Sequence, residues 1–588
     1  MGNSKKKIVR NSFVLIVVFL LLLSNSILII NAKITCDNIQ KQNNNFMNRF
    51  IQNTDNNNSR LSFILKLIII SLILGVPLFF LLKHVQNHEK MEYVLHGTIV
   101  TMNGMHGTIP NGNILISDGL IKEIWTDDET PSHNISNLPY IDTMGYIFPG
   151  LIDCHNHLMY NTIPIWNVSQ KYNNRYEWRE SPNYYPDIKS PSNILVRSDN
   201  ADLLSETVKY AEVKALVGGT TAIHGANIPN PAFTNSLVRN IESYNIGECR
   251  LLNTVENISS WKGIQSVVLL NKLGVLDTFL IHLAEGTDDR SHNEFEILKD
   301  KGLLIDPLVS IHSIPLNRSD YAELAESGAN MIWSPTSNLL LYGATANVKS
   351  AWEEGVCVGL SPDWSPSGTK NSLGELKIAD QWNKDKLDGF FSDYNLTEMV
   401  ITNPAKMCGW ENRCGKIEEG FQADLVVIDK YNDIYNPYRS LINAIDFDVK
   451  LVTVGGDPLY GLVEYINLLK PFDYEILEFD GWTRALDITK DSVADGEQLF
   501  SEISDTLAEV MTFDPEILYE YFDVGDMTFD EFLDWLDEIF WSGLHPVPLD
   551  PINTYGDSAY FHALEESENL NSNFNCNLSF YYDRAPIE

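Results

Sequence analysis

The sequence predicts an α/β protein built around a (β/α)8-type TIM barrel, and three observations lead to this prediction. Short apolar runs alternate with helical stretches from Ile147 to about Lys406, which is typical of a parallel sheet covered by helices. Residues that carry chemistry follow several of these runs, where the carboxyl ends of barrel strands would lie. Strand-like runs stand on both sides of this region, so we expect a small β-sandwich built from both segments.

Seven barrel strands are predicted, from the runs FPGLIDC, GTTAIHG, RLLNTVE, FLIHLAE, LIDPLVSIH, NMIWSP and VCVGLSPD. Before them, Asp118-Gly119 between two alternating apolar runs predicts a β-hairpin. After the barrel, ADLVVID and KLVTVGG read as strands that complete the first β-unit. Near the end of the chain, Thr528 and Glu531 have the spacing of a helix capping box.

Five regions follow from this pattern. They are a membrane-anchor region at 1–90, the first part of the β-sandwich at 91–146, the barrel at 147–406, the second part of the β-sandwich at 407–470, and an acidic, mostly helical C-terminal extension at 471–588.

Two apolar stretches predict N-terminal transmembrane helices at 11–32 and 63–83, because about 20 apolar residues can span a bilayer. The basic cluster before the first stretch favours a cytosolic amino terminus, so two spans would return the catalytic domain to the cytosol. The first stretch also fits a cleaved signal peptide. If the second stretch did not span, the main domain would be lumenal or secreted.

The composition is that of a folded protein, with 44% hydrophobic and 21% charged residues among 588. Residues 471–588 hold 28 acidic and 3 basic side chains, which gives −25 of the formal net charge of −37. No basic face is available for phosphates, which argues against nucleic acid as a partner. A solvated acidic helical tail is favoured over a docking surface. The seven cysteines are scattered and predict no disulfide framework.

A candidate metal site begins at His155-Asn156-His157, directly after the run FPGLIDC. Side chains two apart on a strand point the same way, so one strand end can offer two imidazoles to one ion. His282, His312 and Asp363 each end another apolar run, where a barrel delivers its catalytic groups. Histidines and a carboxylate suit one divalent metal ion, with Zn²⁺ favoured and Fe or Mn as alternatives.

The same residues predict a hydrolytic reaction. A water held by such an ion can ionise near neutral pH and attack a carbon that carries a nitrogen leaving group. Glu285 lies three residues after His282 and could protonate a ring nitrogen or the leaving amine, and Asp363 could take the proton of the attacking water. A helix-capping or surface glutamate is the alternative for Glu285.

The ordered motifs PGLIDCHNH, GGTTAIHG, HLAE, WSPTSNLLLYG, SPDWSPSG and GKIEEGFQADLVVID resemble the amidohydrolase superfamily from about Met91 to Gly461. The branch most similar to this pattern contains the cytosine, guanine and adenosylhomocysteine deaminases. The resemblance implies one metal ion with ligands at His155, His157, His282 and Asp363. It implies that Glu285 is the general acid/base, that Asp363 also accepts a proton, and that His312 contacts the hydrolytic water or the developing oxyanion.

Substrate-binding positions are implied by the same resemblance. Asn338 lies in the segment SPTSN and is expected to orient a polar group of the substrate, with Trp333 and Trp364 beside the substrate. Trp333 stands where the family often has a histidine, which places a standard purine or pyrimidine in doubt. The interval from Thr220 to His282 is short for the family and is expected to hold one strand fewer.

An aromatic, proline-rich insertion between Asn161 and Asn200 follows the first metal motif, and it predicts either a lid or a surface loop packed on the barrel. The function predicted from the whole chain is that of a metal-dependent hydrolase acting on carbon–nitrogen bonds other than peptide bonds. It would deaminate a heterocycle or open a cyclic amide of a small-molecule substrate. The alternative is a membrane-tethered scaffold without activity, and a homo-oligomeric state is left open.

Overall fold

The computed structural model describes most of the chain from Met91 to Asp583. The residues left out within this range are 105–106, 197–200, 226–236, 244–250, 255–257, 259, 431–435, 490–497, 523, 526, 540–542 and 573–575.

The predicted membrane localisation needs correction. Among the residues that the structure describes, no helix combines the length and the apolar character needed to cross a bilayer. The two stretches at 11–32 and 63–83 lie outside the described residues. An apolar run of sufficient length is necessary for a spanning helix but does not by itself establish one. The prediction of a membrane-bound protein is therefore withdrawn.

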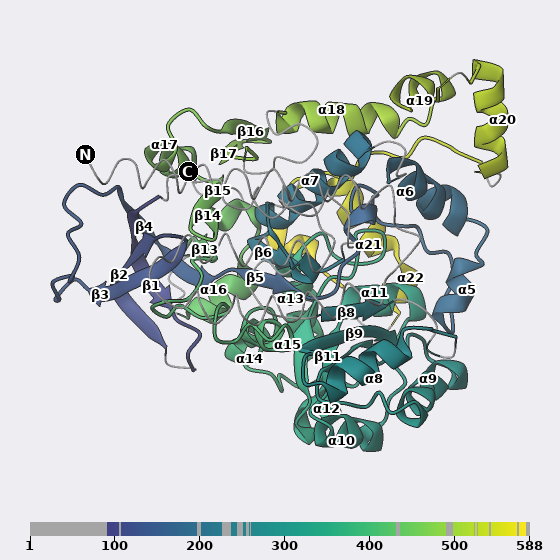
Figure 1. Cartoon of the computed structure of the whole chain (residues 1–588), viewed down its shortest axis with the longest axis horizontal. Helices are drawn as coiled ribbons and strands as arrows, with labels where there is room; N and C mark the ends of the chain where they lie inside the picture. Colours follow the sequence, from purple (N-terminus) through teal and green to yellow (C-terminus); the bar gives the residue numbers. More distant parts are fainter. Residues whose placement is uncertain are drawn as a thin grey trace, which may run out of the picture. The chain divides into compact units, whose positions relative to one another are not determined.

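Strands from both sides of the barrel form one sheet, with nine strands among the described residues (Figure 1). The order is β16-β17-β15-β14-β13-β4-β1-β2-β3. Neighbouring strands are antiparallel, except that β1 runs parallel to β4. The strands are β1 (Tyr93–Val100), β2 (Thr108–Ser117), β3 (Leu120–Thr126), β4 (Tyr140–Pro149), β13 (Leu425–Ile428), β14 (Val449–Val454), β15 (Asp457–Gly461), β16 (Glu475–Phe479) and β17 (Trp482–Leu486).

Local sequence explains two turns of this sheet. Asp118 and Gly119 both have positive φ, 58° and 81°, and they join β2 to β3 as the Asp-Gly pair predicted. A second Asp-Gly pair, at residues 480 and 481, lies between β16 and β17, and φ of Gly481 is 83°. The C-terminal extension therefore begins with a β-hairpin, which corrects the expectation of helices from residue 471 onward.

The barrel is made of eight parallel strands within the described part of the chain. They form a three-stranded sheet, β5-β6-β7, and a five-stranded sheet, β12-β11-β10-β9-β8. An isolated parallel bridge between Asn156 and Asp363 joins the ends of β5 and β12. The strands are β5 (Leu151–Asp153), β6 (Thr220–Ile223), β7 (Arg239–Asn240), β8 (Leu251–Thr254), β9 (Thr278–Leu283), β10 (Leu308–His312), β11 (Asn330–Trp333) and β12 (Cys357–Leu360).

The strand that the sequence did not predict is β7. The expectation of one strand fewer between Thr220 and His282 is wrong, because both β7 and β8 lie in this interval. With two residues, β7 is too short to produce a periodic pattern, and it is recognised only by its parallel pairing with β6.

Helices follow the barrel strands (Figure 1), and several begin at a capping side chain. Asp288 accepts a hydrogen bond from Ser291 N, and Asn317 forms a capping box with Asp320. The helices are α7 (Ala201–Val217), α8 (Ile264–Lys272), α9 (Asp289–Asp300), α10 (Arg318–Glu326), α11 (Pro335–Tyr342), α12 (Val348–Glu354), α13 (Ser372–Lys386), α14 (Asp393–Glu398) and α15 (Thr402–Met407), with a short 3-10 turn, η4, at Ile241–Ser243.

The aromatic insertion is packed on the barrel. Trp166, Tyr172 and Trp178 are buried within it, and they belong to the largest apolar core of the protein. Asn174 caps its central helix by accepting hydrogen bonds from the backbone N–H groups of residues 176 and 177. The elements are η1 (Leu158–Tyr160), α5 (Arg175–Arg179), η2 (Tyr185–Lys189) and α6 (Ser190–Leu195).

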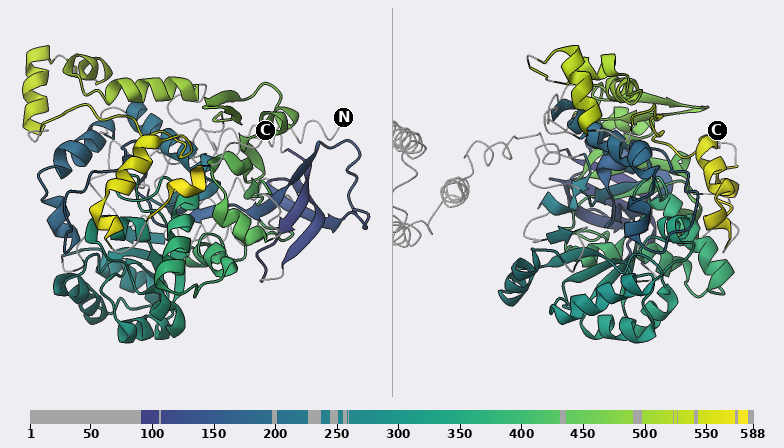
Figure 2. Two further views of the ribbon diagram at one scale, coloured as in Figure 1. Left: turned by 180° about the vertical axis from the view of Figure 1, so that it is seen from behind. Right: turned by 90° about the vertical axis from the view of Figure 1, so that its right-hand side faces the viewer.

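The rest of the C-terminal extension is helical, and its last part is buried against the barrel. Thr528 and Glu531 form the predicted capping pair, since Glu531 Oε2 accepts from Thr528 N at 2.8 Å. Tyr560, Leu564 and Leu570 share a core with Leu339 and Ile378 of the barrel helices. Figure 2 shows these helices, in yellow, over the barrel. The remaining helices are α16 (Pro437–Asn443), η5 (Asp446–Asp448), α17 (Val463–Leu469), α18 (Phe500–Val510), α19 (Pro515–Tyr521), α20 (Phe529–Ile539), α21 (Ser558–Glu566), α22 (Glu568–Asn571) and α23 (Ser579–Tyr582).

This packing corrects the interpretation of the acidic region as a solvated tail. The expectation failed because net charge describes the whole extension, whereas the apolar residues of α21 to α23 are spaced to face the barrel.

Candidate active site

The ends of four barrel strands bring the predicted metal ligands together. His155 Nε2 lies 3.0 Å from His282 Nε2 and 3.2 Å from Asp363 Oδ1. His157 Nε2 lies 3.2 Å from His282 Nε2 and 3.4 Å from Asp363 Oδ1. His312 joins His155 and His282 in a second group of ligand atoms that lie within 4.8 Å of one another. The spacing read from the sequence therefore corresponds to a cluster in space.

Backbone conformation aims two of these side chains. His312 has φ of 75° and Asp363 has φ of 76°, both in the left-handed region that non-glycine residues rarely adopt. At the end of a strand, such a conformation turns the side chain of the residue out of the regular alternation of the strand. Conformations of this kind concentrate at functional sites, where the surrounding structure holds them in place.

The cluster fits a divalent metal ion. Ligands around a tetrahedral zinc ion, with bonds of about 2.0–2.1 Å, lie roughly 3.3 Å from one another. The four spacings between His155, His157, His282 and Asp363 run from 3.0 to 3.4 Å. Burial, together with the neighbouring histidines, holds the pKa of His155 and of His282 well below the usual value. Neutral imidazoles are the form that binds a metal.

Hydrogen bonds around the cluster orient the ligands. Ser334 Oγ lies 2.9 Å from His155 Nδ1, so a proton on Nδ1 leaves Nε2 free to act as a ligand. Ser337 Oγ donates to Asp363 Oδ2 at 2.7 Å. Asp153 accepts from His155 N at 3.1 Å and from Asn156 Nδ2 at 2.6 Å. Such contacts fix the ring orientation and the carboxylate position before an ion binds.

Glu285 lies beside the cluster and is surrounded by donors. Its Oε2 is 3.7 Å from His312 Nε2 and 3.8 Å from Arg175 Nη1, and its Oε1 accepts from Tyr342 OH at 2.6 Å. Burial alone would raise the pKa of Glu285, but the nearby His312, Arg175 and Arg179, with the Tyr342 hydrogen bond, lower it below its usual value. Glu285 is therefore a buried carboxylate at the mouth of the barrel, and its environment excludes a surface or helix-capping role.

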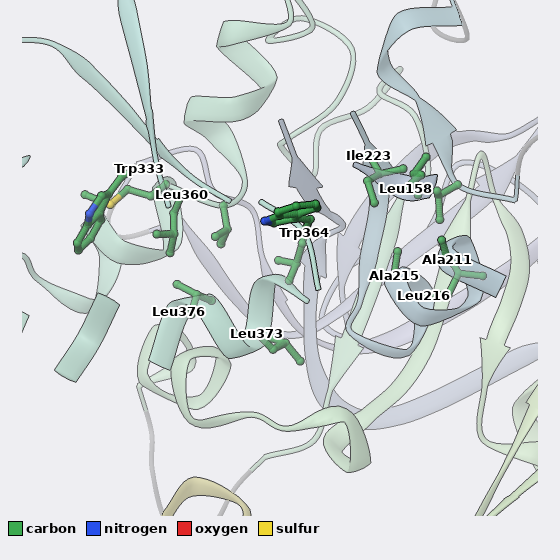
Figure 3. Packing of buried hydrophobic residues seen from close by; sticks show 14 of the residues in the cluster. Leu158, Ala211, Ala215, Leu216, Ile223, Trp333, Leu360, Trp364, Leu373 and Leu376 are labelled. Atoms are coloured by element: carbon green, nitrogen blue, oxygen red, sulfur yellow. The ribbon is translucent and has the colours of Figure 1, made fainter. Parts of the chain in front are cut away.

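The three predicted substrate-binding residues are placed differently. Asn338 Oδ1 is 2.9 Å from His312 Nδ1, and the ring of Trp364 meets that of His157 edge-on at 5.9 Å. Trp333 is fully buried, and its Nε1 donates to Thr345 Oγ1 at 2.7 Å. Figure 3 shows Trp333 and Trp364 in one apolar cluster with Leu360. Asn338 and Trp364 therefore each contact a histidine of the cluster.

Sequence reasoning missed Arg175, Tyr342 and Trp178. Arg175 belongs to the insertion, and its Nη1 donates to His282 O at 3.2 Å while its Nη2 pairs with Glu294 at 3.0 Å. Trp178 Nε1 donates to Tyr342 OH at 2.8 Å, which continues the chain of contacts from Glu285. The available signal was the Asn174 cap, which marks a helix inside the insertion. The insertion thus supplies part of the site and is not merely a covering loop.

Buried Glu375 gives a pH-dependent stability that can be measured. It accepts hydrogen bonds from Thr336 N, Thr336 Oγ1 and Thr369 Oγ1, and burial raises its pKa to about 7. Between about pH 4.5 and 7 only the folded state keeps this proton, so the free energy of unfolding falls as the pH rises through that window. Glu375→Gln cannot ionise. We expect the free energy of unfolding of this variant, relative to that of the wild type, to rise by up to about 3 kcal/mol from pH 5 to pH 8.

Urea unfolding of both proteins at the two pH values measures this difference. Glu296→Gln on the exposed face of α9 is the matched control, and its free energy of unfolding should follow the wild type at both values. A Glu375→Gln variant whose stability parallels the wild type across pH would contradict the raised pKa.

Comparisons with known proteins find one matching family model and several similar enzymes. Residues 277–459 match the model of the Amidohydrolase family. A 5-methylthioadenosine/S-adenosylhomocysteine deaminase of Bacillus cereus is 25% identical over 383 residues, which cover 58% of this chain and 86% of the relative. A protein of the same description from Caldicellulosiruptor saccharolyticus is 25% identical over 416 residues, covering 63% and 93%.

A solved structure shares the fold. An adenosine deaminase from Xanthomonas campestris with bound zinc superposes with a TM-score of 0.51 at 15% sequence identity, covering 63% of this chain and 92% of the other. The ordered motifs, the parallel barrel and these relatives agree. The chain therefore contains an amidohydrolase-family region at residues 277–459, and it resembles deaminases of the amidohydrolase superfamily along most of their length.

Proposed function

We propose that this enzyme is a zinc-dependent deaminase that removes the amino group of an adenine-type nucleoside. The observation that carries the proposal is the position of Glu285, a buried carboxylate 3.7 Å from His312 and next to the cluster of imidazoles and Asp363. Hydrolytic removal of an amino group needs a nucleophile and proton carriers within reach of one carbon atom. At one end of the barrel, this arrangement combines proton carriers with ligands for an ion that would supply the nucleophile.

We assign His155, His157, His282 and Asp363 as the ligands of one divalent ion. Bound there, the ion would lower the pKa of a water molecule and so supply a nucleophile near neutral pH. Zinc is favoured over iron and manganese because three imidazoles and one carboxylate are typical zinc ligands. The adenosine deaminase from Xanthomonas campestris, which shares the fold, has bound zinc.

We assign proton transfer to Asp363 and Glu285, and stabilisation of the developing negative oxygen to His312. Asp363 accepts the proton of the attacking water, and the hydrogen bond from Ser337 keeps its second oxygen in place. Glu285, held between Tyr342 and Arg175, is ionised at rest, so it takes up a proton released by the attacking water and passes it to a ring nitrogen or to the leaving amine. His312 Nε2 faces this region because its Nδ1 is tied to Asn338, and it stabilises the developing negative oxygen.

Two observations support a nucleoside substrate. Two relatives that align with this chain along most of their own length are named 5-methylthioadenosine/S-adenosylhomocysteine deaminases. Trp364 lies beside His157 and makes edge contacts with Tyr160 and a tilted contact with Trp178, so aromatic rings stand next to the ligands. Flat heterocycles pack well against such rings. Trp333, which placed a purine in doubt, is buried, and its Nε1 donates to Thr345 Oγ1 at 2.7 Å.

Ammonia release from the full-length protein tests the proposal. We expect about one zinc per chain and release of ammonia from 5-methylthioadenosine, S-adenosylhomocysteine or adenosine, with loss of activity after chelation and recovery with zinc. Elemental analysis and a coupled ammonia assay measure both quantities. Ring opening of a cyclic amide without ammonia release from any aminoheterocycle would contradict deamination. A fully loaded protein that acts on neither class would contradict the proposed function as a whole.

A further inference from the structure

Three buried charges and the half-buried Asp557 join the C-terminal extension to the barrel. Asp550 pairs through one carboxylate oxygen with Lys214 of α7 and through the other with Lys370, the latter at 2.9 Å. Lys370 also pairs with Asp557 at 2.6 Å. The side chains of Lys214, Lys370 and Asp550 are exposed by 3% or less. Buried ammonium groups need such partners, because an unpaired charge away from water costs several kcal/mol.

Lys214 connects this group to the loops that carry the metal ligands. Its Nζ donates to Asn161 O at 3.0 Å and to Ser365 Oγ at 2.7 Å. Ser365 lies two residues after Asp363, and its N–H donates to Asn161 Oδ1 at 3.1 Å. Lys214 thus ties together the segment after His157 and the segment after Asp363.

The hydrogen bonds continue from Asn161 to the His-x-His motif. Asn161 Nδ2 donates to Asn156 Oδ1 at 2.7 Å, and the same oxygen accepts from His157 N at 2.7 Å. Asn156 lies between the two histidines and is also bridged to Asp363. Only polar contacts of 2.7–3.0 Å therefore separate Lys214 from the backbone of a proposed metal ligand.

We propose that Asp550 is a positioning residue for the metal site. It pairs with Lys214 and Lys370, and through Lys214 it fixes the backbone that follows His157 and the backbone that follows Asp363. The inference rests on the proposed function, because it takes these residues as metal ligands. The C-terminal extension would then support the active site. The backbone of Asp550 is held in place as well, because its N–H donates to Thr162 O at 2.9 Å and its O accepts from Tyr210 OH at 2.8 Å.

Charge supports the same conclusion. Burial lowers the pKa of Lys214 to about 8, and Asp550 is the partner that opposes this change while Lys370 adds to it. Without this carboxylate, Lys214 would lose the anion that opposes the lowering of its pKa, whereas Lys370 would keep its pair with Asp557. Lys214 would then lose its proton or move away from Lys370, and either change weakens its hydrogen bonds to Asn161 O and to Ser365 Oγ, which lies on the loop that carries Asp363.

The test is the zinc affinity of the full-length protein carrying Asp550→Asn, measured by competition with a chelator. We expect a loss of about tenfold to 100-fold, as found when groups that orient metal ligands are removed. Asp557→Asn is the matched control, because Asp557 belongs to the same extension and pairs with Lys370 but not with Lys214. It should stay within about threefold of the wild type. Equal zinc affinity of Asp550→Asn and wild type would overturn the proposal.

A double variant separates positioning from simple loss of stability. Asp550→Ala with Lys214→Met removes both charges, and replacing a buried pair by apolar groups is often neutral for folding. Asn161 O and Ser365 Oγ still lose their donor, so we expect a thermal midpoint near that of the wild type together with weak zinc binding. A double variant with wild-type zinc affinity would overturn the inference. If the wild type itself held no zinc, the metal assignment would fail as well, and the two failures are distinguishable.

Discussion

Replacing Glu285 by glutamine is expected to lower kcat by about 10²- to 10⁴-fold while the protein keeps its zinc. Glutamine has nearly the same shape as glutamate and can still accept from Tyr342 OH, so the local packing should persist. It cannot carry the proton that a ring nitrogen or the leaving amine requires. The metal should stay, because Glu285 is not among the clustered ligand atoms around His155. Steady-state kinetics and zinc content of the same preparation measure both effects.

The control for this substitution is Glu296→Gln. Glu296 pairs with Lys299 on the half-exposed side of α9 and lies outside the site, so its removal should leave kcat within about twofold of the wild type. If Glu285→Gln retained the activity of Glu296→Gln, the general acid/base would have to be another residue. Loss of zinc from Glu285→Gln would instead show that the carboxylate supports the ligands.

Much of the site was predictable because its residues stand at fixed places in a repeating pattern. His155, His157, His282, His312 and Asp363 each end an apolar run, and parallel strands bring their carboxyl ends to one edge. Period and spacing are local properties of the sequence, and they predicted seven of the eight barrel strands in the described residues. The two-residue β7 has no period, and only its pairing with β6 reveals it.

The rest of the site depends on contacts between distant segments, which no local pattern encodes. Arg175 lies in an insertion that could have been a loose loop, yet it reaches His282 O and Glu294 across more than 100 residues. Asp550 lies in an extension whose net charge predicted a solvated tail, yet it is buried between two lysines. The residues of a buried ion pair and of an exposed one are the same in the sequence. Burial decides their role, and burial becomes known only from the fold.

Replacing His282 by alanine is expected to abolish zinc retention and, with it, activity. His282 Nε2 lies 3.0 Å from His155 Nε2 and 3.2 Å from His157 Nε2, so its loss removes one of the two groups, the other being Asp363, that contact both of these histidines. A ligand that binds only the folded state stabilises it by about 4 kcal/mol at 1,000 times its Kd. The wild type should therefore show a rise in thermal midpoint on adding zinc, and His282→Ala should show none. Elemental analysis after dialysis gives the zinc content directly.

His292→Ala is the matched control for this variant. His292 lies at the start of α9, pairs with Asp320 at 2.8 Å and is one-third exposed, so it removes an imidazole close in sequence to His282 without touching the cluster. It should keep both the zinc and the zinc-dependent rise in midpoint. Full zinc occupancy in His282→Ala would mean that His155, His157 and Asp363 suffice as protein ligands, and the site would then be a three-ligand centre in which His282 serves the substrate.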